Sequence, residues 1–139
     1  MFAEDSSREA SLELEPLIRR LYVAFNRRDI DAVLAALTDD VVWANGLDGG
    51  YVHGREGVRA YWTEQFTRIS STVEPIAIER QPDGRIRVEV HQTVRDADSQ
   101  QVLADTRVSH LFTFTGGSLI SRFEIGDSES NEHPAGGAV

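Results

Sequence analysis

His110 is the side chain of this sequence best suited to chemistry. It lies in an alternating stretch in which Val108, Phe112 and Phe114 share its face. An imidazole among apolar side chains loses hydration, which lowers its pKa and leaves a neutral base near physiological pH. Two interpretations stay open: an acid/base group in a pocket, or a core histidine bonded to a backbone carbonyl or a neighbouring carboxylate.

Arg122 and Glu124 form a second pair of candidates. They are two residues apart in the last expected strand, so they share one face while Phe123 and Ile125 lie on the other. Glu124 would hold the tautomer of His110 or act as the acid/base itself, and Arg122 would clamp a carboxylate or enolate oxygen. The alternative is a structural ion pair on the sheet.

His91 lies on a polar face that is expected to point outward or into a dimer interface. A ligand-binding role stays open because the neighbouring strand supplies His110. Asp105 is expected to pair with Arg87 or Arg95 across a hairpin. A metal site needs three or four converging ligands, and the sequence has no H-x-H or H-E-x-x-H spacing. We therefore predict neither a metal nor a cofactor.

Helices are predicted for the first half of the chain. Apolar residues recur at helical spacing over residues 14–25 and over residues 30–37, and Asp29 is a good N-cap for the second of these helices. Residues 38–40 are expected to end that helix. A third helix is expected to open at residue 54, after a glycine-rich loop.

Strands are predicted for the second half, because the hydrophobic period changes from near 3.6 to 2 after Ser71. Pro75 favours an edge position for the first of them. The expected strands, including a short one between the second and third helices, cover residues 41–43, 73–79, 85–95, 102–115 and 119–125. Helices followed by antiparallel strands indicate an α+β domain.

Composition excludes several classes of function. The chain has 139 residues, a formal net charge of −9 and no cysteine, so disulfide and thiolate chemistry are absent. An acidic surface repels phosphate groups, so neither nucleic acid nor an anionic membrane is an expected partner. No apolar run is long enough to cross a membrane and the first residues do not form a signal peptide. We expect a cytoplasmic location.

Several loose motifs occur in a characteristic order. They are T-D-D-V-V-W, H-G-R-E-G-V-R-A-Y-W, H-x-F-x-F and G-G-S-L-I-S-R-F-E-I. In this order the chain resembles the NTF2-like superfamily, which includes ketosteroid isomerases and SnoaL-type cyclases, and it is most similar to the SnoaL-like members. The resemblance implies a cone, with three N-terminal helices packed on a curved antiparallel sheet that encloses a pocket.

The resemblance also allows a comparison with the isomerases residue by residue. Their oxyanion tyrosine falls at Leu21, their general base at Asn45 and their protonated acid at His110. Tyr22 is adjacent to Leu21 but lies about 100° around the helix, so it is not a simple substitute. We therefore do not expect a standard ketosteroid isomerase.

Further expectations follow from the resemblance. It aims Arg122 and Glu124 into the pocket. It places ligand contacts at Trp43, Asn45, Tyr61, Trp62 and Phe66. From the residue pattern itself, Tyr22, His91 and Phe112 are further expected ligand contacts. It also implies a homodimer through the outer sheet face, with contributions from Arg87, Glu89, Thr93, Arg107, Leu111, Phe123 and Ile125.

The expected function is binding of a small, mostly apolar carbonyl-type ligand in the cone. One hypothesis is a cofactor-free isomerase, cyclase or dehydratase that uses His110 as acid/base. The alternative is a non-catalytic ligand-binding or protein-interaction module on the same fold. We expect one SnoaL-like domain over residues 1–139, with a folded core at about residues 12–126 and flexible tails at residues 1–11 and 127–139.

Overall fold

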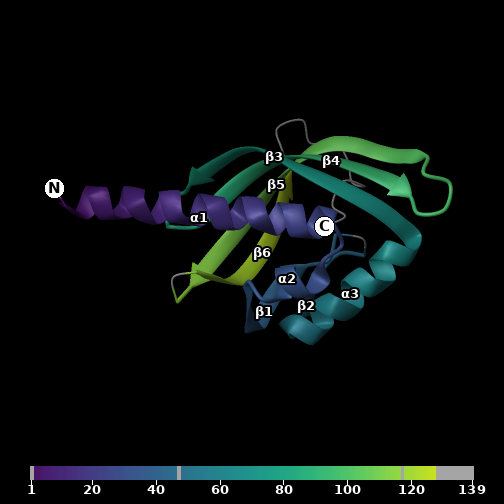
Figure 1. The fold of residues 1–139 in the computed structure, drawn as a ribbon, viewed down its shortest axis with the longest axis horizontal. Helices are drawn as coiled ribbons and strands as arrows, with labels where there is room; N and C mark the ends of the chain where they lie inside the picture. Colours follow the sequence, from purple (N-terminus) through teal and green to yellow (C-terminus); the bar gives the residue numbers. More distant parts are fainter. Residues whose placement is uncertain (1, 47, 117, 128–139) are drawn as a thin grey trace.

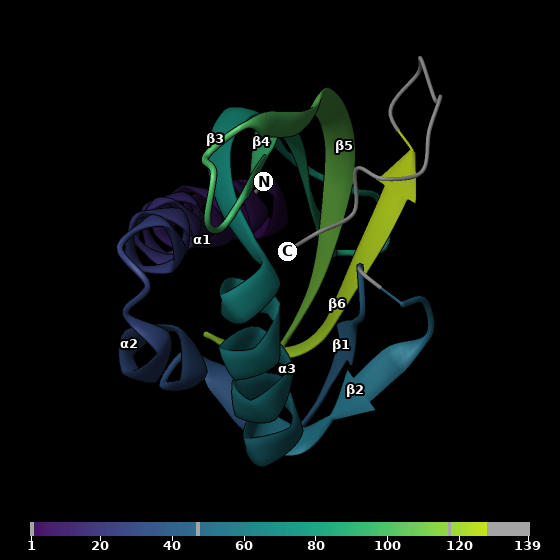
Figure 2. The same ribbon diagram turned by 90° about the vertical axis from the view of Figure 1, so that its right-hand side faces the viewer.

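The computed structural model describes residues 2–46, 48–116 and 118–127 of the chain. Three helices form one layer, and a curved six-stranded sheet forms the other (Figures 1 and 2). The helices are α1 (Phe2–Asn26), α2 (Ile30–Leu34) and α3 (Gly54–Arg68). Figure 2 shows all three against the same face of the sheet, so the predicted α+β cone is confirmed.

The sheet has the strand order β2-β1-β6-β5-β4-β3. Its strands are β1 (Leu37–Ala44), β2 (Tyr51–His53), β3 (Ile69–Arg80), β4 (Ile86–Asp96), β5 (Val102–Thr115) and β6 (Leu119–Asp127). All pairings are antiparallel except that of β1 with β6, which is parallel. β3 is an edge strand, as Pro75 predicted, and the register shifts between Pro75 and Ala77.

The second helix is shorter than predicted. The N-cap is confirmed, because the Asp29 carboxylate accepts a hydrogen bond from the backbone N–H of Ala32 at 3.3 Å. The helix ends at Leu34, however, and the predicted helix residue Leu37 begins β1. Residues 38–40 are strand because Leu37 pairs with Ile120 of β6, so tertiary pairing overrides the local helical pattern. The short strand β2 was also missed.

Two side chains at the end of α1 fix this helix over β3. Asn26 donates to the carbonyl of Val73 at 2.8 Å and accepts from its N–H at 2.9 Å. Arg28 adopts a left-handed backbone conformation, with φ of 63°, and its guanidinium donates to the hydroxyl of Ser70 at 2.9 Å. The same guanidinium lies 4.7 Å from the ring centre of Phe66. These contacts tie the C-terminal end of α1 to the start of β3.

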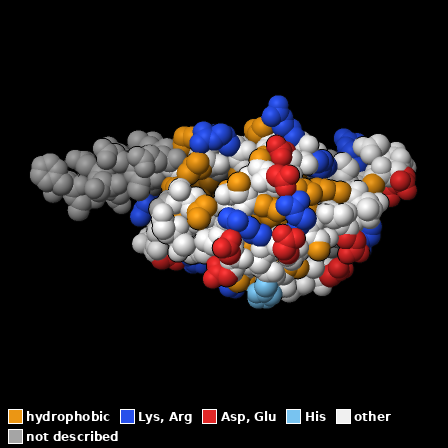
Figure 3. Space-filling view, turned by 60° about the horizontal axis from the view of Figure 1, so that its bottom comes forward, with side chains coloured by type: hydrophobic (Ala, Val, Ile, Leu, Met, Phe, Trp, Pro, Cys, Tyr) orange, Lys and Arg blue, Asp and Glu red, His pale blue; other side chains and the backbone are white. Residues whose placement is uncertain are grey.

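The apolar faces predicted for the helices do form the core. Ile18, Tyr22 and Phe25 of α1 are buried, as are Val58 and Trp62 of α3. Charged side chains remain outside, and Figure 3 shows a face on which acidic and basic groups are interspersed. Within the described residues, no helix is long and apolar enough to cross a membrane.

The limits predicted for the folded core remain a prediction. Helix α1 begins at Phe2, before residue 12, and β6 continues to Asp127. Residues 128–139 of the predicted C-terminal tail lie outside the described residues.

Candidate ligand site

His110 lies in the middle of β5 with no exposed surface. It faces the helices because the alternation of β5 places it on the inner side with Val108 and Phe112. Its Nδ1 atom is hydrogen-bonded to the hydroxyl of Tyr22 on α1, at 2.7 Å, and the two rings are nearly parallel. Tyr22 and His110 therefore form a buried pair that joins the first helix to the sheet.

The direction of this hydrogen bond can be assigned from the surroundings. Burial raises the pKa of the Tyr22 hydroxyl well above its ordinary value, so this group keeps its proton. If the hydroxyl accepted from Nδ1–H, its own hydrogen would have no acceptor among the described residues, at a cost of about 1–3 kcal/mol. Tyr22 therefore donates to Nδ1, and the Nε2 atom of His110 carries the ring hydrogen.

The imidazole is neutral at physiological pH. Burial lowers the pKa of His110 to about 3, because desolvation penalises the charged ring. The lowering predicted from its apolar neighbours is thus in the right direction. With Nδ1 engaged by Tyr22, what His110 offers at neutral pH is a neutral N–H donor at Nε2.

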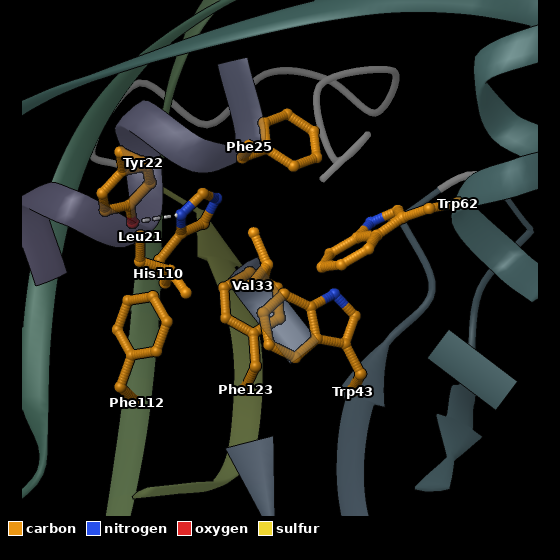
Figure 4. Close-up of a pocket in the computed structure, with 9 residues that line it drawn as sticks. All are labelled: Leu21, Tyr22, Phe25, Val33, Trp43, Trp62, His110, Phe112 and Phe123. Carbon is orange, nitrogen blue, oxygen red and sulfur yellow. Dashed lines mark hydrogen bonds between the residues drawn. The ribbon is translucent and has the colours of Figure 1, made fainter. Parts of the chain in front are cut away.

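A small cavity lies beside this donor. Its volume is about 10 Å³ for water-sized spheres, which is near the room that one water needs. Figure 4 shows the second ring nitrogen of His110 facing the space bounded by Phe25, Trp43 and Trp62. The lining residues are Leu21, Tyr22, Phe25, Val33, Trp43, Trp62, His110, Phe112 and Phe123.

Three buried nitrogen atoms on this lining have no hydrogen-bond partner among the described residues. They are Nε2 of His110 and the indole nitrogens of Trp43 and Trp62. The two indoles stand edge to face with 5.2 Å between ring centres. The Nε2 atom of His110 is therefore a buried donor without a partner among the described residues.

The predicted ligand contacts divide into two groups. Tyr22, Trp43, Trp62 and Phe112 line the cavity together with His110. Asn45, Tyr61 and Phe66 do not belong to this lining. Asn45 accepts from the N–H of Asp48, the Tyr61 hydroxyl accepts from the N–H of Gly46, and Phe66 packs on Phe25.

The predicted orientation of Arg122 and Glu124 is wrong. Both lie on the outer face of β6, where Arg122 donates to Glu124 at 3.1 Å and Glu124 also accepts from Arg85 at 3.2 Å. Phe123 between them is fully buried and stacks on Trp43 with 4.1 Å between ring centres. The structural ion pair, which was the alternative interpretation, describes this face.

A β-bulge explains the inversion. Thr113 of β5 pairs with Arg122 and the next residue, Phe114, pairs with Ile120, so Ser121 is an extra residue in β6. Counting by twos from the buried Ile120 would place Arg122 and Glu124 inside, but the extra residue turns Phe123 inward instead. For the same reason Ile125 pairs with His110 on the inner face, and neither Phe123 nor Ile125 belongs to the outer face predicted for dimerisation.

His91 and Asp105 also lie outside the site. They bond each other at 2.5 Å on the outer face, so the predicted pairing of Asp105 with Arg87 or Arg95 is wrong. Arg87 instead donates to Glu89 and Ser109. His91 does not approach His110, because inner and outer faces alternate along β4 and β5.

Four cavity-lining residues were not predicted as ligand contacts: Leu21, Phe25, Val33 and Phe123. The first three lie on the apolar helix faces that the sequence assigned to the core. In a cone these faces also line the space between helices and sheet, so the apolar pattern alone does not identify the residues at the cavity. Elsewhere in the described chain, His, Asp and Glu side chains form no cluster of three or more that could hold a metal ion.

Comparisons with known proteins agree with this architecture. Among curated proteins, none matches the chain. An NTF2-like protein of unknown function from Burkholderia pseudomallei is 29% identical, with a TM-score of 0.69 over 84% of this chain and 88% of that one.

Two structures of lower identity share the fold and hold ligands. A ketosteroid-isomerase-like protein from Catenulispora acidiphila, in complex with trimethylamine, is 15% identical (TM-score 0.69; 88% of this chain, 92% of that one). A protein from Mycobacterium tuberculosis, in complex with estradiol-17β-hemisuccinate, is 16% identical (TM-score 0.70; 88% and 96%). The SnoaL-like domain family matches residues 18–123, which include both members of the Tyr22–His110 pair. The chain therefore belongs to the SnoaL-like family of the NTF2-like superfamily.

Proposed function

We propose that this protein binds a small, mostly apolar carbonyl compound inside the cone, with Nε2–H of His110 donating to the carbonyl oxygen. The observation that carries the proposal is the buried Nε2 atom, which faces a cavity and has no partner among the described residues. Leaving such a donor unsatisfied costs about 1–3 kcal/mol, and a ligand oxygen would remove this cost. The other walls are apolar or aromatic, which suits a mostly apolar molecule.

A ligand larger than water needs additional room. The cavity of about 10 Å³ is bordered by Leu21, whose side chain also borders an open groove along α1. Rotation of this one flexible side chain would enlarge the cavity toward the groove without moving the sheet. Proteins with the same fold have been crystallised with trimethylamine and with estradiol-17β-hemisuccinate, which supports the binding of a small molecule.

The site favours binding over acid/base catalysis. Its described lining contains two titratable side chains, and burial keeps both neutral near pH 7, since it lowers the pKa of His110 and raises that of Tyr22. General acid/base catalysis works best when the pKa of the group is near the working pH. A hydrogen bond from His110 would still polarise a bound carbonyl, which is the catalytic contribution that this pair could make.

The test compares two probes of nearly equal shape. Acetophenone carries a carbonyl oxygen where α-methylstyrene carries a methylene group, so they differ in one acceptor. We expect wild-type protein to bind acetophenone about tenfold more tightly, as measured by calorimetry or by NMR titration. His110→Phe should abolish this preference, whereas Glu124→Gln, on the outer face, should retain it.

Circular dichroism and urea unfolding establish that each variant is folded before binding is compared. Equal affinity of the wild type for both probes would refute the proposal, as would a preference that survives in His110→Phe. The homodimer that the resemblance implies stays a separate prediction, and sedimentation equilibrium tests it.

A further inference from the structure

A second, larger space lies on the other side of Leu21. It is an open groove with a volume of about 380 Å³, bounded by α1, by α2 with the segment that follows it, and by the start of β6. Leucine and alanine side chains form most of its walls, and Arg20 and Ser118 are its polar members. This volume lies within the range of about 300–1,000 Å³ that is typical of small-molecule sites.

Arg20 is a cation without a counter-ion in the described part of the chain. Its neighbour Arg19 pairs with Glu15 at 3.0 Å, but Arg20 makes no ion pair or hydrogen bond to any described residue. The positions three and four residues away on α1 hold Pro16, Leu17, Val23 and Ala24, none of which is acidic.

The facing helix does not supply the missing charge either. Asp31, the one acidic residue of α2, is engaged by Arg59 at 2.8 Å. Within the described residues of a chain with a formal net charge of −9, the guanidinium of Arg20 therefore stands unneutralised at an apolar groove. A guanidinium recognises carboxylates through paired N–H donors.

We propose that this groove is a binding site for an organic anion with an apolar body, whose carboxylate pairs with Arg20. The alanines of α1 and α2 leave room for the apolar part, and the hydroxyl of Ser118 is a further donor at the groove. Leu21 lines both the groove and the buried cavity, so its side chain is the partition between them. The groove is thus distinct from the His110 site, and the inference does not rest on the function proposed above.

Octanoate is the probe, and 1-octanol, which lacks the charge, is its control. We expect octanoate to bind and to shift the NMR methyl signals of Ala24, Ala32 and Ala35. Arg20→Gln should weaken octanoate binding about tenfold and leave octanol binding unchanged. Arg27→Gln removes the same charge beside the end of α1, outside the groove, and should change octanoate affinity less than twofold.

Three results would overturn the inference. They are no octanoate binding by the folded wild type, an equal loss of affinity in Arg20→Gln and Arg27→Gln, and methyl shifts that map elsewhere. His110→Phe should leave octanoate binding unchanged, and this separates failure of the groove site from failure of the His110 site.

Discussion

The neutral, buried state of His110 predicts a specific dependence of folding stability on pH. In the unfolded chain the ring has its ordinary pKa of 6.5, while burial lowers the pKa to about 3 in the folded protein. Between these values the unfolded state binds a proton that the folded state does not. Stability is therefore lost as the pH falls below about 6.5.

The magnitude follows from the two pKa values. Each pH unit below about 6.5 should cost about 1.4 kcal/mol, and the loss should approach roughly 5 kcal/mol near pH 3. A domain of this size has a free energy of unfolding of about 5–15 kcal/mol. This one histidine should therefore contribute much of the acid sensitivity of the protein.

The assay is urea unfolding of the wild type and of His110→Asn between pH 8 and pH 4.5, followed by tryptophan fluorescence. Hydrogen bonds from Arg85 and from the N–H of Ser99 lower the pKa values of Asp83 and Asp96, respectively. The stability that these bonds contribute is also lost as the carboxylates become protonated in acid. Both carboxylates are present in both proteins, so their effect cancels in the difference between the two curves.

The expected difference between wild type and variant is constant above pH 6.5 and changes by about 1.4 kcal/mol per pH unit below it. A constant offset at all pH values is allowed, because asparagine packs differently from histidine. Curves that stay parallel down to pH 4.5 would refute the reasoning. They would mean that the folded protein protonates His110 as readily as the unfolded chain does.

Three further substitutions test individual contacts. Tyr22→Phe removes the hydroxyl that donates to His110 and leaves Nδ1 unsatisfied, so the free energy of unfolding measured in urea should fall by about 2–3 kcal/mol. A decrease below about 0.5 kcal/mol would contradict the assigned hydrogen bond. Asn26→Ala removes both hydrogen bonds to Val73 and should lower the free energy of unfolding by about 2 kcal/mol, with faster hydrogen exchange at the Val73 amide. Unchanged exchange would show that Asn26 does not protect this amide. Leu21→Ala should lower the free energy of unfolding by about 2–4 kcal/mol and join the cavity to the groove. Benzophenone should then bind the variant more tightly than the wild type in calorimetry, and equal affinities would show that the Leu21 side chain does not separate the two spaces.

The sequence predicted best where one face of an element is uniformly apolar. The face of α1 that holds Ile18, Tyr22 and Phe25 is buried as expected, and so are Ile86 and Val88 of β4. Burial of such a face dominates the local energy, so the period of the pattern is enough to identify it. This also explains why Phe25 was assigned to the core and not to the cavity, since a periodic pattern does not distinguish a packed interior from its empty part.

The sequence predicted poorly where register decides the outcome. Alternation correctly separated Arg122 and Glu124 from Phe123, but it does not state which set points inward. The extra residue Ser121 reverses the count within β6, and a bulge of this kind has no signature in the composition of the strand. The end of α2 has a similar cause, since the pairing of Leu37 with Ile120 depends on residues far away in sequence.

Leu21 and Tyr22 are adjacent in α1 but have different roles in the structure. Consecutive residues are about 100° apart on a helix, and here Leu21 borders the open groove while the Tyr22 hydroxyl reaches His110 on β5. The Tyr22 hydroxyl donates to the Nδ1 atom of the imidazole. The hydroxyl thereby orients His110 and leaves Nε2–H as the donor. A ring held in this way, with a pKa of about 3, stays neutral near pH 7, so the role proposed for it is that of a hydrogen-bond donor and not of a proton carrier.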